Sequence, residues 1–83
     1  MSTYAEVLDA RGQVCPMPVI SLAQAAAGLA VGQHVLVLSD DAAAAHDIPA
    51  WCRLRGHVFH GEVPVPDGGP GAAYDVELGA AAG

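Results

Sequence analysis

Cys15 lies in the segment of the chain where residue types suited to covalent chemistry stand closest together. Pro16 follows it directly, and proline is favoured at the first helical position because its missing N–H would be unpaired there. We therefore expect Cys15 at the N-cap of a helix. The positive end of the helix dipole favours a thiolate there, and the thiolate is the nucleophilic form of cysteine. The dipole alone accounts for less than about one pKa unit.

The neighbours of Cys15 set how far its thiol is activated. Pro18 has no N–H, so only the Met17 amide is left as a near cap donor, and we expect moderate activation. Arg11 would add to it if its side chain turned toward the sulfur. Asp9 would hydrogen-bond loop amides or pair with Arg11, or would simply end a strand.

Two plainer interpretations stay open at this segment. Gly12 is expected to serve the turn rather than a phosphate site, because no Gly-rich phosphate loop is present. Cys15 would alternatively be a small apolar residue that fills the corner where a strand meets a helix, as many free cysteines do. The arginine and aspartate before it and the prolines after it favour the functional interpretation.

The second cysteine, Cys52, follows Trp51 and shares an apolar helix face with Ile48. We expect Cys52 and Trp51 to fill the core. A resolving partner for Cys15 is the alternative role of Cys52. A structural disulfide is not expected, because reducing conditions in the cytoplasm keep thiols free.

The four histidines do not form a ligand pattern in the sequence. His57 and His60 lie three apart on an expected strand, so they should point to opposite faces. No Cys-x-x-Cys or His-x-x-x-His spacing exists. We therefore expect no metal and no other cofactor.

Length and charge limit the class of protein. The 83 residues predict one domain, with a tail over 79–83 that frays. A net charge of −6, with only three basic residues, argues against direct nucleic-acid binding and favours a basic protein partner or a merely solvated surface. The N-terminus does not resemble a signal peptide, and no apolar run is long enough to span a membrane. We expect a cytoplasmic protein without membrane contact.

The apolar patterns predict six elements that position these residues. Strands are expected over 4–10, 34–38, 57–63 and 73–78, and the last of these should alternate buried and exposed residues. Helices are expected over 16–29 and 42–55, the second capped by Ser39, Asp40 or Asp41 and ending at Gly56. Pro49 should kink or break it, with Asp47 able to cap the second half. A turn is expected over 67–71.

This element order predicts an α/β fold. Two right-handed crossovers place both helices on one face of the sheet, which leaves the other face open. The last two strands are close enough to form a hairpin, so the four-stranded sheet is mixed. The expected architecture is a two-layer β-α-β-α-β-β sandwich.

Two segments of the chain carry a family resemblance. The first has the pattern Asp-x-Arg-Gly-x-x-Cys-Pro-x-Pro, formed by Asp9, Arg11, Gly12, Cys15, Pro16 and Pro18. It resembles the motif of the TusA-like sulfur-carrier family, also called SirA-like. The second segment, 39–41 with 46–52, is similar to another signature of that family, and the resemblance covers about 7–60. Gln13 departs from the usual leucine, and 21–30 lacks the basic residues that many members carry.

The resemblance implies the same fold and a persulfide on Cys15. It implies a sulfurtransferase of the carrier type, which takes sulfane sulfur from a cysteine desulfurase or rhodanese-like donor protein and passes it to an acceptor protein. The acceptor pathway stays open among tRNA thiolation, molybdenum-cofactor supply and sulfur oxidation. The alternative is a regulatory protein–protein interaction module in which Cys15 is a redox sensor or a relic.

Overall fold

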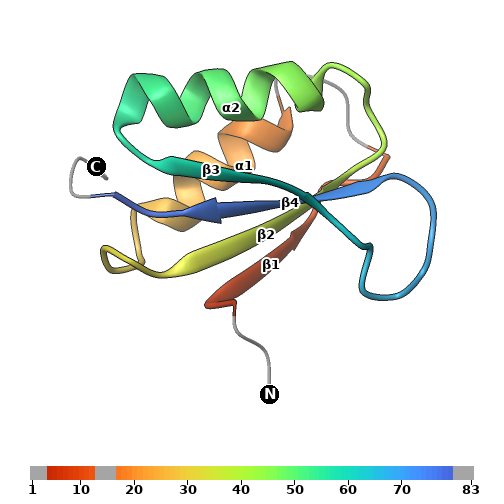
Figure 1. Cartoon of the computed structure of the whole chain (residues 1–83), viewed down its shortest axis with the longest axis horizontal. Helices are drawn as coiled ribbons and strands as arrows, with labels where there is room; N and C mark the ends of the chain where they lie inside the picture. The colour runs from red at the N-terminus through yellow and green to blue at the C-terminus, as the bar shows by residue number, and fades with distance from the viewer. Residues whose placement is uncertain (1–3, 13–16, 80–83) are drawn as a thin grey trace.

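The computed structural model describes residues 4–12 and 17–79, and it has the expected order of elements. Two helices, α1 (Met17–Ala26) and α2 (Ala44–Arg55), cover one face of a four-stranded sheet (Figure 1). The strands are β1 (Glu6–Asp9), β2 (His34–Ser39), β3 (Val58–Val63) and β4 (Ala72–Glu77). The predicted two-layer β-α-β-α-β-β sandwich is confirmed.

The strands run in the order β1-β2-β4-β3, with a parallel pair at one side and a hairpin at the other. β1 and β2 are parallel, whereas β4 is antiparallel to both β2 and β3. Asp9, Ser39 and Ala72 therefore meet at one end of the sheet, which we call the motif end. His34 and Glu77 pair at the opposite end, which we call the histidine end.

The main core lies between the sheet and the helices. Ile48 and Cys52 of α2 are almost fully buried there, and Leu22 and Ala26 of α1 close the other side. The sheet contributes its helix-facing residues to the same cluster: Val35, Val37, Tyr74, Val76 and Leu78. The alternation predicted for the last strand is confirmed, because Asp75 and Glu77 are only half-buried while Tyr74 and Val76 are buried.

The other face of the sheet is less open than expected. Leu36, Leu38 and Ala73 form a second buried cluster on it, near the motif end, and Tyr4, Val63 and Val65 pack against them. β2 is therefore buried on both faces, as its continuous apolar run predicted. Toward the histidine end this face carries half-exposed polar side chains instead.

The helix α2 runs as one helix through Pro49, so the break, with recapping by Asp47, is wrong, whereas the alternative of a kink stays a prediction. Burial of Ile48 and Cys52 on the same face stabilises the helix on both sides of the proline. Its N-cap is Ala43, without a side-chain cap, so the expected Ser39, Asp40 or Asp41 cap is also wrong.

Turns lie at the start of α2 and at the ends of both helices. Before α2, the Oδ1 of Asp41 accepts a hydrogen bond from the Ala43 N–H at 3.0 Å and so stabilises the turn. The predicted end at Gly56 is confirmed by its left-handed φ of 80°. α1 ends at Ala26, earlier than expected, and the Gly28 and Leu29 N–H groups then bond three residues back. Neither helix in the described part of the chain is long and apolar enough to cross a membrane.

Candidate functional site

Arg11 holds two distant segments together at the motif end. Its Nε and Nη2 donate to the two carboxylate oxygens of Asp9 at 2.9 and 2.8 Å. Its Nη1 and Nη2 donate to the carboxylate of Asp67 at 3.2 and 2.9 Å, and Nη1 also reaches the Pro70 carbonyl at 3.4 Å. We call Asp9, Arg11 and Asp67 the Arg11 clamp. It uses all five N–H donors of the guanidinium.

The clamp also fixes the charges of its members. Hydrogen bonds from Arg11 lower the pKa of Asp9 to about 2, and they lower the pKa of Asp67 in the same direction. The two carboxylates in turn raise the pKa of Arg11. One cation is therefore matched by two anions, so the clamp as a whole is negative. The donors of Arg11 point to the two aspartates and to Pro70, and a turn of this side chain toward the Cys15 sulfur stays a prediction because Cys15 lies outside the described residues.

The turn after β1 is anchored at both sides. The alternatives considered for Asp9 occur together: it ends β1, pairs with Arg11, and its Oδ1 also accepts from the Arg11 N–H at 3.2 Å. Gly12 has a φ of 86°, a conformation that glycine adopts without steric cost, so its turn role is confirmed. The Gly12 N–H donates to Oδ1 of Asp40, the residue after β2, at 3.0 Å. The chain is thus tied to two neighbouring segments just before Cys15.

Sequence reasoning missed two members of this site. Asp67 lay in a segment predicted only as a turn, and Asp40 was considered only as a helix cap and as part of a family signature. Both are brought to Arg11 and Gly12 by the sheet, across 56 and 28 residues of chain. An aspartate within an Asp-Gly-Gly turn was the available signal, because its Oδ1 accepts from the Gly69 N–H at 2.8 Å and so fixes the carboxylate.

Cys15 and Pro16 lie outside the described residues, so their predicted places at the N-cap and first helical position stay predictions. The described chain stops at Gly12 and resumes at Met17, where α1 begins. Pro18 is the second residue of α1, within its first turn as expected.

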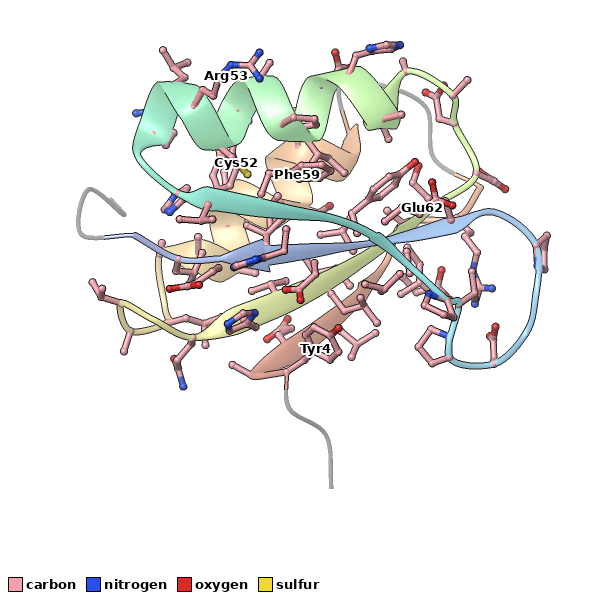
Figure 2. The ribbon with its side chains drawn as sticks, in the orientation of Figure 1. Tyr4, Cys52, Arg53, Phe59 and Glu62 are labelled. Atoms are coloured by element: carbon pink, nitrogen blue, oxygen red, sulfur yellow. The ribbon has the colours of Figure 1, made fainter. Side chains whose placement is uncertain are left out.

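Cys52 is a free thiol inside the main core, as predicted. It points from α2 toward the sheet, whereas Arg53 points away (Figure 2). It is only 1% exposed, and burial raises the pKa of its thiol to about 11. A buried neutral thiol is a poor nucleophile, which argues against a role for Cys52 as resolving cysteine.

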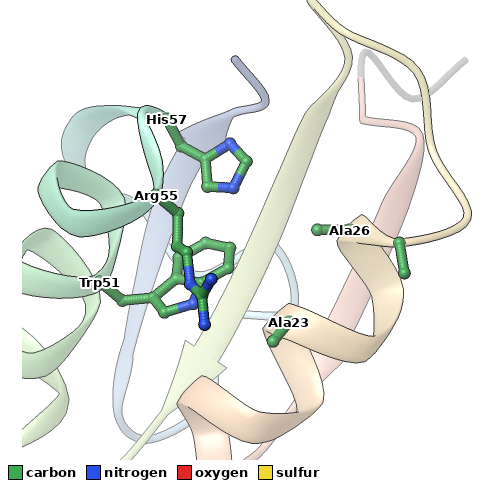
Figure 3. A pocket seen from close by; sticks show the side chains of 6 residues that line it. Ala23, Ala26, Trp51, Arg55 and His57 are labelled. Atoms are coloured by element: carbon green, nitrogen blue, oxygen red, sulfur yellow. The ribbon is translucent and has the colours of Figure 1, made fainter. Parts of the chain in front are cut away.

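A hollow of about 130 Å³ lies between the two helices, away from the motif end (Figure 3). Trp51 and His57 face Ala23 and Ala26 across it, and Arg55 lies at its side. The Trp51 and His57 rings stack at 4.5 Å between centroids. Trp51 packs against the core as predicted, but it is only partly buried because one side lines this hollow.

The fold and the anchored turn define a small two-layer α/β domain in which the segment leading to a cysteine is held at one end of the sheet. The model of the family described as sulfurtransferase TusA matches residues 6–68, so the chain belongs to the TusA family. This membership supports a role in carrying sulfur.

Two relatives agree with that assignment. A candidate sulfur carrier protein of Archaeoglobus fulgidus is 43% identical over 51 residues, which covers 61% of this chain and 70% of that protein. The crystal structure of a SirA-like protein from Desulfitobacterium hafniense superposes with a TM-score of 0.73 at 28% identity. That match covers 89% of this chain and 97% of the other.

Proposed function

We propose that the chain accepts sulfane sulfur as a persulfide on Cys15 and passes it to an acceptor protein. Its membership of the TusA family supports sulfur carriage in general. The observation that carries the finer proposal is the anchored turn of Asp9, Arg11 and Gly12. This turn fixes the chain three residues before Cys15, the second cysteine of the sequence beside the buried Cys52.

The transfer step is an exchange between two sulfur atoms of a disulfide-like bond. The Cys15 thiolate attacks the outer sulfur of a persulfide, R–S–SH, on a cysteine desulfurase or rhodanese-like donor. The new S–S bond forms as the donor's S–S bond breaks, and the donor leaves as a thiolate. The proton stays on the transferred sulfur, and no external oxidant is needed. An acceptor thiolate then repeats the exchange on the outer sulfur of Cys15–S–SH.

The described residues have positioning roles in this proposal. Arg11 has a positioning role, because its five donors serve the two aspartates and the Pro70 carbonyl. It holds β1 and the 67–71 turn together, and Gly12 ties the same segment to Asp40. The dipole of α1 and the two prolines supply the remaining activation and stiffness at Cys15. The expected pKa of the Cys15 thiol is therefore only moderately lowered.

The partners of the carrier are proteins. With nine acidic and three basic residues, the surface fits basic donor and acceptor proteins better than nucleic acid. We place both exchanges in the cytoplasm, where thiols stay reduced. The acceptor decides the pathway, and thiolation, cofactor synthesis and sulfur metabolism all fit the same chemistry at Cys15.

The test is the intact mass of the protein after incubation with a cysteine desulfurase and cysteine. We expect a gain of one sulfur atom on the native chain and none on Cys15→Ser. Two added oxygens nominally mimic one sulfur, so each sample is repeated with dithiothreitol, which removes a persulfide but leaves a sulfinic acid. Circular dichroism should show that Cys15→Ser folds normally.

Cys52→Ala provides the matched control, because it removes the other thiol. It should load as much sulfur as the native chain, since Cys52 is buried and protonated. If Cys15→Ser still gains sulfur and Cys52→Ala gains none, the carrier role belongs to Cys52 and the proposal is overturned. If neither a desulfurase nor a rhodanese donor loads the chain, the regulatory interaction module becomes the better description.

A further inference from the structure

Three side chains with metal-ligand atoms gather at the histidine end, on the sheet face away from the helices. They are His34 of β2, His60 of β3 and Glu77 of β4, and one ligand atom from each lies within 4.8 Å of the other two. The His60 Nε2 is 2.8 Å from Glu77 Oε1, and the His34 Nε2 is 3.7 Å from the same oxygen. The two imidazole rings stack at 5.2 Å between centroids.

The sheet register accounts for this gathering. His34 lies directly opposite Glu77 in the β2–β4 pairing. On the other side of β4, Phe59 pairs with Val76 and Gly61 with Asp75, so His60 is the extra residue of a β-bulge. A bulge redirects a side chain, and this one brings His60 to Glu77. Gly61, with a φ of 102°, adds no side chain to the same face.

Asp75 orients the first of these histidines. Its Oδ1 lies 2.8 Å from Nδ1 of His34, so that nitrogen donates to the carboxylate and Nε2 is the ring nitrogen that faces Glu77. A carboxylate on the far nitrogen is the usual support of a histidine that binds a metal. The side chains of the three candidate ligands are 33%, 40% and 36% exposed, so an ion could reach them.

We propose that His34, His60 and Glu77 bind one divalent transition-metal ion of the zinc class. Ligands about 2.0–2.1 Å from a tetrahedral Zn²⁺ lie about 3.4 Å from each other. The two separations from Glu77 Oε1, 2.8 and 3.7 Å, bracket that value, so small side-chain rotations suffice. Two imidazole nitrogens favour Zn²⁺, Ni²⁺ or Cu²⁺ over Mg²⁺ and Ca²⁺, which prefer oxygen ligands.

Three protein ligands leave the fourth position of such an ion open. In a small domain that position is free for water or for a donor group of another molecule. The site is independent of the sulfur chemistry, because His34 and Asp9 stand at opposite ends of the paired strands β1 and β2. The metal would therefore act on association or stability and not on the Cys15 exchange.

The test is isothermal titration of ZnCl₂ into the full-length Cys15→Ser variant, which removes the Cys15 thiol as a competing ligand. We expect one ion per chain, and binding that is weaker by at least about tenfold in His60→Ala and in Glu77→Gln. His46→Ala is the matched control, because this exposed histidine lies on α2, and it should bind as the parent does. MgCl₂ should give no comparable heat.

Two outcomes would overturn the proposal. Equal affinity in His60→Ala and the parent would mean that the three side chains form only a hydrogen-bonded surface network. Equal weakening in His46→Ala would mean scattered binding by surface histidines.

A second readout, the ¹⁵N shifts of the imidazole nitrogens, should show Zn²⁺ on Nε2 of both His34 and His60. Circular dichroism of each variant separates lost binding from lost folding.

Discussion

The two ends of the sheet carry different kinds of polar cluster. At the motif end, one guanidinium binds two carboxylates and a carbonyl, and every donor has an acceptor. At the histidine end, two imidazoles share one carboxylate oxygen, and the second contact is long at 3.7 Å. The ends are about 17 Å apart along the six residues of β2. The first cluster is complete by itself, whereas the second gathers two imidazoles and a carboxylate that are partly exposed to a ligand.

This difference indicates a division of labour along β2. The motif end fixes the backbone that leads to Cys15, so its polar groups are used for position. At the histidine end, His34, His60 and Glu77 contact one another from three strands, and their side chains stay partly exposed. A carrier that must present one sulfur to two partners in turn benefits from such a separation, because a second ligand can bind without altering the loop before the thiol.

Glycine substitutions should give the largest contrast between the two ends. Gly71→Ala places a Cβ at 2.7 Å from the Ser39 carbonyl oxygen at a φ of 89°, so backbone must move at the motif end. Gly61→Ala has a similar positive φ of 102° at the bulge but meets nothing within 4 Å. We expect losses of about 2–4 kcal/mol for Gly71→Ala and about 1–2 kcal/mol for Gly61→Ala, measured by urea denaturation.

The sulfur-loading assay gives a second comparison of Gly71→Ala with Gly61→Ala. Gly71→Ala should also slow loading of Cys15, because the displaced 67–71 turn carries Asp67 of the clamp. Gly61→Ala should load normally. Equal losses of stability in the two variants would contradict the idea that close packing at the motif end is what holds the loop.

Most of the fold was predictable because the patterns that indicate its elements lie within short stretches of neighbouring residues. The continuous apolar run of β2 and the alternation of β4 each report burial directly, and Gly56 ends α2 where expected. The break expected at Pro49 does not occur, because the core contacts of Ile48 and Cys52 on the same helix offset the local cost of the proline. Those contacts depend on tertiary packing, which a helical pattern alone does not contain.

The same distinction applies to the sites. Asp9, Arg11 and Gly12 are neighbours in the sequence, so their mutual contacts were expected. Asp67 joins Arg11 only because β4 lies beside β2 and brings the preceding turn to the motif end. The three candidate metal ligands come from three strands and depend on a one-residue bulge, so the spacing of histidines in the sequence could not reveal them.

Arg11→Gln should change how the free energy of unfolding depends on pH below about pH 4. Arg11 lowers the pKa of Asp9 to about 2 and also lowers that of Asp67. Depressed carboxyl pKa values stabilise the fold above the unfolded values near 4, and this contribution is lost as the pH falls toward 2. The native chain should therefore lose its advantage over Arg11→Gln between about pH 4 and pH 2.

Urea midpoints at pH 7, 4, 3 and 2 measure this effect, with Arg53→Gln as the control on the exposed side of α2. Arg53→Gln should follow the native chain through the whole range. A constant gap between the native chain and Arg11→Gln down to pH 2 would show that the clamp acts through packing and not through the charge of its aspartates.

The smallest effect is expected from His57, beside the histidine end but on the helix face of the sheet. Burial, with a contribution from Arg55, lowers the pKa of His57 below its usual 6.5. Its Nδ1 accepts a hydrogen bond from the Gly79 N–H at 2.9 Å, which requires the neutral ring. A lowered histidine pKa means that the unfolded chain binds the proton first, so stability present above about pH 6.5 is lost as the pH falls below it.

His57→Gln keeps an acceptor for the Gly79 N–H and removes the titration. The slope of unfolding free energy against pH between about 7 and 5 should be shallower in the variant, by at most about 1.4 kcal/mol per pH unit. An unchanged slope would assign this limb to the other histidines. Because the aspartates of the clamp titrate only below about pH 4, the two windows do not overlap, and one pH series on each variant reports the two ends of the molecule separately.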